Sequence, residues 1–250
     1  MKPATGSAAA TLEREFDATA YRYDLMVGLN PGYHEHLRTA ADVLAAALPA
    51  APPVRALDLG CGSGASTVAL LDALGERAAS AQVVGLDASD GMLDVARGKS
   101  WVGGVRFVHG MAEDIATRAG QWALPVPVDG VFACYLFRNV GDRDATLSAV
   151  FDVLAPGGRL VTQEYSVTGS RRSAVLWSAV CWTVVIPLSL VLTRRTKLYR
   201  YLWRSVLRFD SVERFSSRLC AAGFEDVQVT TVDGWQRGIL HTFSARRPAA

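Results

Sequence analysis

The chain has 250 residues and a mass of 26.8 kDa, with 50% hydrophobic residues, 20% charged residues and a net charge of +2 at pH 7. This length is enough to bury a substantial core in one large domain or two small ones. The composition excludes an intrinsically disordered chain, and the near-neutral charge excludes a protein that binds nucleic acid mainly through positive charge.

The N-terminal segment and the cysteines indicate the compartment. The first residues contain no apolar stretch of signal-peptide length, so we expect a cytoplasmic protein. The cysteines lack C-x-x-C spacing and a histidine placed to complete a zinc site, which predicts reduced, buried thiols and no metal. They are Cys61, Cys134, Cys181 and Cys220.

Along the chain, residues 1–50 predict an N-terminal helical cap that ends at a proline-rich segment, 49–53. After it, short apolar runs that suit strands covered on both faces alternate with helix-like stretches, which predicts a doubly wound parallel sheet. The predicted strands are 54–59, 82–86, 105–108, 128–135 and 158–165. The predicted helices are 65–74, 91–98 and 145–154, the last ending at Pro156-Gly157-Gly158.

The last part of the chain predicts a helix at 211–222 followed by two strands, 227–232 and 238–245, that alternate like an antiparallel pair. Before that helix, residues 173–193 carry no charge at all. As a helix rising ~1.5 Å per residue, this run would reach ~31 Å, about the thickness of a bilayer core. A single crossing is excluded if the predicted sheet is right, because strands of one sheet would then lie on opposite sides of the membrane.

Two interpretations of the uncharged run therefore stay open: a buried helix pair, or an apolar lid over a lipid-like substrate that rests on a membrane. Pro187 is expected to break the helix near its end. Basic residues recur at helical spacing in the next segment, interleaved with aromatic ones, so one basic and aromatic face could meet anionic headgroups; a solvated helix face is the alternative. These basic residues are Lys197, Arg200, Arg204 and Arg208, and the aromatic ones are Tyr199, Tyr201, Trp203 and Phe209.

A glycine-rich turn follows the first predicted strand, where Asp58 precedes the G-x-G-x-G segment from Gly60 to Gly64. Glycines there let the backbone approach a ligand, and the following helix presents free N–H groups. Dinucleotide enzymes more often show G-x-G-x-x-G, so the tighter spacing after an acidic residue points to S-adenosylmethionine. Asp87, at the end of the second strand, supports this because a carboxylate there can accept hydrogen bonds from ribose hydroxyls.

Together with these residues, several motifs resemble class I methyltransferases and, more closely, the ubiquinone/menaquinone C-methyltransferase family. The motifs are Phe16-Asp17 with Arg22-Tyr23-Asp24-Leu25-Met26, Asp87-Ala88-Ser89-Asp90-Gly91-Met92-Leu93, Phe137-Arg138-Asn139-Val140-Gly141-Asp142, and Val153-Leu154-Ala155-Pro156-Gly157-Gly158. The resemblance implies a Rossmann-like, doubly wound α/β fold with a seven-stranded sheet. The sheet would be mostly parallel with an antiparallel last strand, and N-terminal helices and a helical insert before the last two strands would accompany it.

The same resemblance implies the residues of the site. S-adenosylmethionine would contact Asp58, Gly60, Gly62, Ser63, Asp87, Ala88, Met111, Ala112 and Cys134. Where the family has Asp or Asn before Ala to meet the adenine amino group, this chain has Met111. That contact would then fall to the Ala112 backbone, with Glu113 or Asp114 as the compensating carboxylate.

The catalytic residues implied are Arg138, Asn139 and Tyr23. Arg138 follows the fourth strand at the carboxyl edge of the sheet, where its permanent positive charge would stabilise a developing phenolate. Asn139 would orient the ring or a water, and Tyr23 would accept or relay the phenolic proton. The alternative for Arg138 is a surface ion pair with Asp142 or Asp144.

The sequence therefore predicts a methyltransferase domain at 51–250, with residues 167–209 as an apolar and basic lid, and methyl transfer from S-adenosylmethionine to carbon of a lipophilic aromatic, a prenylated quinol. Segment 171–209 is the candidate for peripheral membrane contact. Two alternatives stay open: O- or N-methylation of another hydrophobic metabolite, and a catalytically silent S-adenosylmethionine-binding module. The oligomeric state stays undefined.

Overall fold

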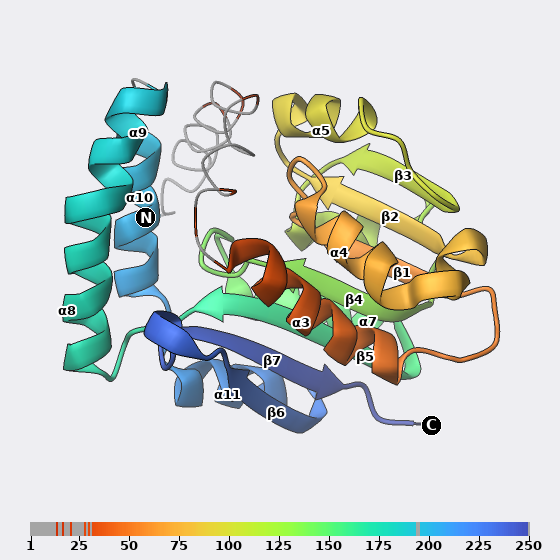
Figure 1. The fold of residues 1–250 in the computed structure, drawn as a ribbon. Helices are drawn as coiled ribbons and strands as arrows, with labels where there is room; N and C mark the ends of the chain where they lie inside the picture. The colour runs from red at the N-terminus through yellow and green to blue at the C-terminus, as the bar shows by residue number, and fades with distance from the viewer. Residues whose placement is uncertain are drawn as a thin grey trace, which may run out of the picture.

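The structure is a computed structural model that describes residues 32–193 and 196–249, together with Arg14, Asp17, Tyr21, Gly28 and Asn30. Seven strands form one sheet in the order β3-β2-β1-β4-β5-β7-β6 (Figure 1). The strands are β1 (Arg55–Leu59), β2 (Gln82–Asp87), β3 (Gly104–His109), β4 (Val128–Cys134), β5 (Leu154–Tyr165), β6 (Glu225–Thr231) and β7 (Leu240–Arg246). β1 to β5 are parallel, and β7 pairs antiparallel with both β5 and β6.

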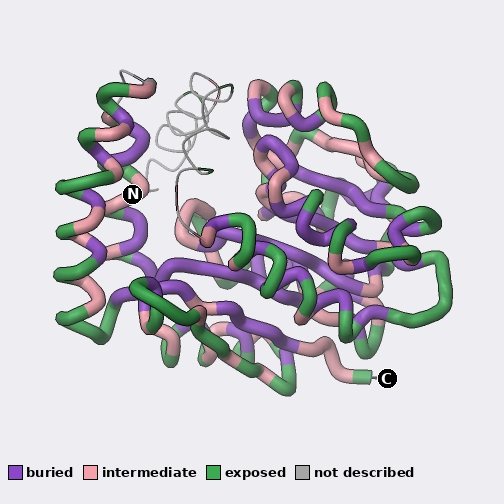
Figure 2. Tube along the Cα trace, in the orientation of Figure 1, coloured by how far each residue is buried: buried purple, intermediate pink, exposed green. Residues whose placement is uncertain are grey.

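Helices cover both faces of this sheet, as apolar runs on its strands require. One face packs against α3 and α4, and the other against α7 and α11, which gives two hydrophobic cores separated by the sheet. The strands between them are buried along most of their length (Figure 2). The helices are α3 (Tyr33–Ala47), α4 (Ala65–Leu74), α5 (Asp90–Arg97), α6 (Ile115–Arg118), α7 (Arg143–Val153) and α11 (Val212–Ala221), with 3-10 turns at Gly75–Ser80, Ala112–Asp114 and Gly234–Gln236.

The predicted strands and helices agree with the structure to within a few residues, and the main difference lies at the start of β5. Helix α7 ends at Val153 because Leu154 already adopts an extended conformation, with φ −76° and ψ 145°. Pro156-Gly157-Gly158 therefore lies inside β5 instead of ending the helix. Gly158 is required at this point, since a Cβ there would lie 2.8 Å from the carbonyl oxygen of Ala155.

The lid, residues 167–209, is a helical hairpin that stands beside the sheet (Figure 1). One arm consists of α8 (Arg171–Val180), the π-helical segment η3 (Cys181–Val185) and α9 (Ile186–Thr193), and the other arm is α10 (Lys197–Arg208). The prediction that Pro187 breaks the first arm is wrong, because helix continues through α9. The π-helical segment directly before Pro187 already interrupts the regular i→i−4 hydrogen bonding, so a residue without an N–H is accommodated there.

Among the described residues, one helix, Arg171–Leu192, has the length and the apolar composition of a membrane span. The strand that precedes it, β5, pairs directly with β7, which follows the lid in the chain. A single crossing would separate two strands that are hydrogen-bonded to each other. The lid is therefore a hairpin on one side of the sheet, and what its outer surface contacts is a separate question.

Candidate active site

The glycine loop between β1 and α4 is held by a buried carboxylate. Asp58 is fully buried, and its Oδ2 accepts hydrogen bonds from Ser66 Oγ at 2.8 Å and Thr67 Oγ1 at 2.6 Å. These bonds fasten the first turn of α4 to the end of β1. Burial raises the pKa of Asp58 to about 6, an effect that the two hydroxyl groups partly offset. Its other oxygen, Oδ1, has no hydrogen-bond partner among the described residues.

The loop itself takes a backbone path that L side chains resist. Gly60, Gly62 and Gly64 have φ values of 70°, 53° and 91°. A Cβ on Gly62 would meet no protein atom within 4 Å, so the loop faces open space at that point. Ser63 is buried, and its carbonyl oxygen accepts a hydrogen bond from Lys99 Nζ at 2.8 Å.

Asp87 connects this loop to the neighbouring strand end. Its Oδ2 accepts from the Gly62 amide at 2.8 Å, and its Oδ1 accepts from the Ser89 amide at 2.8 Å. Burial raises the pKa of Asp87, while these amide hydrogen bonds oppose the rise. The next residue, Ala88, uses its carbonyl oxygen to contact His109 Nε2 at 2.9 Å.

One contact at this edge was not anticipated as part of the site. Asp17 Oδ1 accepts from Ser89 Oγ at 2.5 Å and from the Gly91 amide at 3.0 Å. An N-terminal residue therefore caps the start of α5 and lies next to Asp87 in the fold. The sequence signal was the Phe16-Asp17 pair of the N-terminal motif, but no local pattern linked it to α5.

The region predicted to meet adenine follows β3. Ala112 is buried, whereas Met111 is 38% exposed. Glu113 Oε1 accepts from the Gly141 amide at 3.0 Å, and Asp114 Oδ2 lies 3.3 Å from Arg118 Nε. Both carboxylates proposed to compensate for Met111 therefore have partners within the protein.

Cys134 ends β4 at the centre of this edge and is buried. Burial raises the pKa of its thiol well above the ordinary value, so the group is neutral. Cys61 and Cys181 are buried as well, as the sequence predicts. The prediction of a buried thiol is wrong for Cys220, which is exposed because it lies on the outer side of α11.

A cavity lies between the carboxyl edge of β4 and β5 and the lid. The cavity has a volume of about 400 Å³ and is lined mainly by apolar and aromatic side chains. Four aromatic rings form a continuous row along one wall, with neighbouring centroids 5.6, 5.3 and 4.8 Å apart. In order, they are Tyr33, Tyr135, Tyr165 and Trp177.

Of the described residues that line this cavity, Arg138 is the charged one. Its Nη1 lies 2.9 Å from Oε2 of Glu164, and its guanidinium carbon lies 5.2 and 5.8 Å from the ring centroids of Tyr135 and Tyr165. Burial raises the pKa of Glu164, and the Arg138 charge opposes that rise. The sequence-based prediction assigned Glu164 no role in the site, although Glu164-Tyr165-Ser166 resembles a family motif and a carboxylate at a strand position expected to be buried is unusual.

Asn139 supports the turn that carries Arg138. Tyr135 has a φ of 62°, a conformation that is costly for a residue with a side chain. The Asn139 Nδ2 donates to the Tyr135 carbonyl oxygen at 3.0 Å, and the Tyr135 hydroxyl donates to Gln163 Oε1 at 3.0 Å. Oδ1 of Asn139 is buried without a hydrogen-bond partner in the described part of the chain, so it remains an available acceptor.

The alternative role of Arg138 as a surface ion-pair partner is wrong. Asp142 caps α7 by accepting from the amides of Asp144 and Ala145, and Asp144 pairs with Arg218 at 2.5 Å. Arg138 instead belongs to a buried pair at the cavity. Tyr23, the third predicted catalytic residue, lies outside the described residues.

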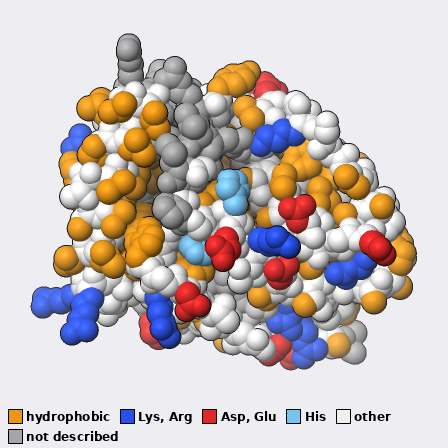
Figure 3. Space-filling view, in the orientation of Figure 1, with side chains coloured by type: hydrophobic (Ala, Val, Ile, Leu, Met, Phe, Trp, Pro, Cys, Tyr) orange, Lys and Arg blue, Asp and Glu red, His pale blue; other side chains and the backbone are white. Residues whose placement is uncertain are grey.

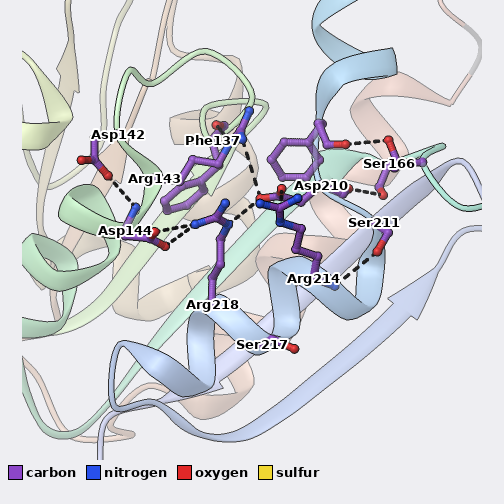
Figure 4. Close-up of polar contacts among 12 residues, drawn as sticks. Phe137, Asp142, Arg143, Asp144, Ser166, Asp210, Ser211, Arg214, Ser217 and Arg218 are labelled. Atoms are coloured by element: carbon purple, nitrogen blue, oxygen red, sulfur yellow. Dashed lines mark hydrogen bonds and ion pairs between the residues drawn. The ribbon is translucent and has the colours of Figure 1, made fainter. Parts of the chain in front are cut away.

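The base of the lid is fastened by a cluster of arginines around one carboxylate (Figure 4). Asp210, between α10 and α11, accepts from Arg218 Nε at 2.7 Å and lies 3.2 Å from Arg214 Nε and 3.7 Å from Arg143 Nη1. Its carbonyl oxygen accepts from Ser166 Oγ at 2.8 Å. The two ends of the lid are therefore joined to each other and to α7 and α11.

The residues around the glycine loop fit S-adenosylmethionine, since open backbone at Gly62 lies beside a buried carboxylate, one oxygen of which has no hydrogen-bond partner within the described ranges. A seven-stranded sheet in this order, with this loop after β1 and Asp87 ending β2, defines a class I S-adenosylmethionine-dependent methyltransferase. The model of the ubiE/COQ5 methyltransferase family matches residues 5–243, and the chain belongs to that family.

Individual proteins agree with this membership. The chain is 35% identical to a demethylmenaquinone methyltransferase of Thermus thermophilus, an alignment that covers 84% of this chain and 90% of the relative. It is 30% identical to the ubiquinone/menaquinone biosynthesis C-methyltransferase UbiE of Shewanella frigidimarina, covering 87% and 84%. A crystal structure of an S-adenosylmethionine-dependent methyltransferase from Thermotoga maritima shares the fold with a TM-score of 0.58 at 17% identity, covering 96% and 99%.

Proposed function

We propose that this enzyme transfers a methyl group to a ring carbon of a prenylated hydroquinone. The observation that carries the proposal is the cavity under the lid, where Arg138, the one cation among its described lining residues, lies against a row of aromatic rings. An aromatic head group can stack on such a row, and a hydrocarbon chain can occupy the remaining apolar space. Two relatives are named for methylation in quinone biosynthesis, which supports the same acceptor class.

When bound, S-adenosylmethionine supplies an electrophilic methyl group on sulfur. A ring carbon becomes nucleophilic enough to accept it when a neighbouring hydroxyl loses its proton, so the protein has to stabilise a phenolate. Arg138 provides a cation that stays charged at every physiological pH, on a side chain that is only 6% exposed. Oδ1 of Asn139 is proposed to hold the second hydroxyl or a water, and Tyr23 is proposed to take up or relay the proton.

Glu164 acts as a positioning residue in this proposal. Its carboxylate holds one end of the Arg138 guanidinium, while the rings of Tyr135 and Tyr165 lie along it. A guanidinium fixed in this way needs less reorganisation when the phenolate forms.

Cofactor contacts are proposed along the carboxyl edge of β1 to β4, away from the lid. The residues are Asp58, Gly60, Gly62, Ser63, Asp87, Ala88, Met111, Ala112 and Cys134. The division into a cap at 1–50 and a methyltransferase domain at 51–250 is part of the same proposal. Because a prenylated acceptor dissolves in lipid, we place the enzyme in the cytoplasm at a membrane surface.

The test is incubation of the purified protein with methyl-labelled S-adenosylmethionine and reduced, prenylated benzoquinol or naphthoquinol in detergent. The expected product carries the labelled methyl group on a ring carbon. Carbon-13 NMR of the extracted quinone distinguishes such a methyl group from one on oxygen or nitrogen. A labelled methyl ether or methylamine, or cofactor binding without any labelled product from these acceptors or from a cell lipid extract, would overturn the proposal.

A further inference from the structure

The lid differs in charge from the rest of the molecule. Residues 167–209 contain eight Lys and Arg residues and no Asp or Glu, in a chain whose net charge is +2, so the remaining residues carry a net charge of −6. This excess of positive charge is not expected of a solvated helix face, because exposed helices usually carry both acidic and basic residues. The lid is the positive pole of the molecule.

After the exposed Arg171 and Arg172 at the start of α8, the exposed side chains of α8, η3 and α9 are mainly apolar. Val175 is 68% exposed, Leu190 is 57% exposed and Val191 is 76% exposed, and Leu176, Trp182 and Val184 are exposed as well. We call these six residues the apolar strip. Figure 3 shows hydrophobic side chains gathered over the lid, with Lys and Arg at its lower end. Exposed apolar patches of this kind usually mark a site of contact with another protein or with a membrane.

The second arm of the lid adds a line of positive charge. Arg200, Arg204 and Arg208 are exposed at i, i+4 spacing on α10, together with Lys197, and we call these four residues the basic ridge. The expectation that the aromatic residues of α10 share this face is wrong for Tyr199 and Phe209, which are buried. The guanidinium of Arg200 lies 5.4 Å from the ring of Trp182, so the ridge and the apolar strip adjoin.

The same helical arm also forms a wall of the cavity. Trp177, Cys181 and Leu188 line it, and Val184 lies at its edge, whereas the other five residues of the apolar strip are not among its lining residues. One layer of helix therefore separates the cavity from whatever covers the strip. A surface that combines apolar side chains, an interfacial tryptophan and adjacent cations has the composition of helices that lie in the interface of a bilayer.

We infer that the outer face of the lid docks on an anionic lipid bilayer, with the apolar strip at the boundary of the acyl chains and the basic ridge among the headgroups. The inference rests on the proposed function in one respect: docking would let an acceptor dissolved in the membrane reach the cavity. A second copy of the chain is the less favoured occupant, because pairing two lids would bring sixteen positive charges together, twice the eight in each.

The experiment measures binding of the full chain to vesicles of phosphatidylcholine containing about one third phosphatidylglycerol, by co-sedimentation at low and high salt. Because each cation near such a surface contributes about 1 kcal/mol, the variant Arg200→Gln/Arg204→Gln/Arg208→Gln should bind about 100-fold more weakly. Val175→Ser/Leu190→Ser/Val191→Ser should also lose at least tenfold in affinity. Brominated lipid should quench part of the tryptophan fluorescence of the wild type, and that quenching should be lost in Trp182→Phe.

The matched control is Arg97→Gln/Arg118→Gln/Arg246→Gln, which removes three exposed charges outside the lid and should bind like the wild type. No binding to anionic vesicles at low salt, equal loss in the control, or a dimer in sedimentation velocity that the serine variant dissociates would each overturn the inference. Turnover of a detergent-dissolved acceptor is measured in parallel. If both lid variants lose vesicle binding but keep normal turnover, the docking inference is supported. If the wild type binds vesicles through the lid but shows no turnover, only the proposed function is overturned.

Discussion

Nη1 of Arg138 lies 2.9 Å from Oε2 of Glu164, and the two side chains are 6% and 0% exposed. The pair joins the turn after β4 to the end of β5, so it lies where ligands bind in open parallel sheets. Removing two charges from water costs free energy, so a buried ion pair often adds little to the stability of the fold. Its place at the cavity wall, against two tyrosine rings, is the basis of our proposal that it presents an oriented cation to the acceptor.

Glu164→Gln tests this role. The substitution keeps the size of the side chain but leaves the Arg138 charge without its counter-ion, so kcat should fall by 10- to 100-fold, while the dissociation constant of S-adenosylmethionine stays within about twofold. Glu164→Asp should recover part of kcat. Kinetics combined with titration calorimetry checks both; equal losses of kcat and cofactor affinity would contradict a positioning role.

Arg138→Ala should abolish turnover, but it also leaves the buried Glu164 charge unpaired, which costs about 3 to 5 kcal/mol of stability. The double variant Arg138→Met/Glu164→Gln removes both charges and serves as the folded control. We expect it to unfold at a denaturant concentration close to the wild type, to bind S-adenosylmethionine and to be inactive. Wild-type turnover in this double variant would show that the pair is not used in catalysis.

Gly62→Ala separates cofactor contact from folding. The residue has φ 53°, and a new Cβ meets no protein atom within 4 Å, so only the backbone penalty of about 1 to 2 kcal/mol is expected in the fold. The methyl group would, however, occupy the space in front of the loop and weaken S-adenosylmethionine binding at least tenfold. Gly157→Ala, at φ 78° and equally uncrowded, is the matched control outside the loop and should keep full cofactor affinity. Similar affinity in both variants would contradict the placement.

The pH dependence of stability should report on Asp58. Burial raises the pKa of this carboxyl to about 6 from 3.8, so the folded protein binds the proton more tightly than the unfolded chain. Its contribution to stability is fully present below about pH 4 and is lost as the pH rises through about 6, a change of about 3 kcal/mol. Urea unfolding of the cofactor-free wild type and of Asp58→Asn between pH 4 and 7 measures it. A difference between the two proteins that does not change with pH would refute the prediction.

Arg218 should stabilise the base of the lid more than its neighbour Arg214. The Arg218 side chain is 20% exposed and bonds both Asp210 and Asp144, whereas Arg214 is 70% exposed. Arg218→Ala should therefore lower the free energy of unfolding by about 2 kcal/mol, and Arg214→Ala by less than about 1 kcal/mol. Chemical denaturation checks the order, and equal effects would mean that Asp210 does not depend on its buried partner.

Much of the fold follows from local signals in the sequence. The runs that became β1, β2 and β4 are apolar on both faces, and the G-x-G-x-G spacing after Asp58 requires the left-handed backbone that the loop adopts. Both depend on contacts between residues close in the chain or on backbone sterics, and such signals are local. The boundary of β5 was less predictable, because extended pairing with β4 replaced the expected end of the helix before Pro156.

Long-range pairings were not predictable in this way. Glu164 is 26 residues from Arg138, and Asp17 is 72 residues from Ser89. Patterns among neighbouring residues therefore could not predict either contact. The face of α10 was also misassigned, since the interleaved basic and aromatic residues were expected on one side, and packing against the first arm of the lid buried Tyr199.

The sequence by itself determined the layered sheet, the cofactor loop and the uncharged run of the lid, because periodicity, glycine conformations and composition are properties of neighbouring residues. Only the tertiary structure decided that Arg138 meets Glu164 at the cavity and that the lid turns one apolar face inward and another outward. Those outcomes depend on which elements the chain brings together, and burial against a distant partner is what fixes a side chain in one direction.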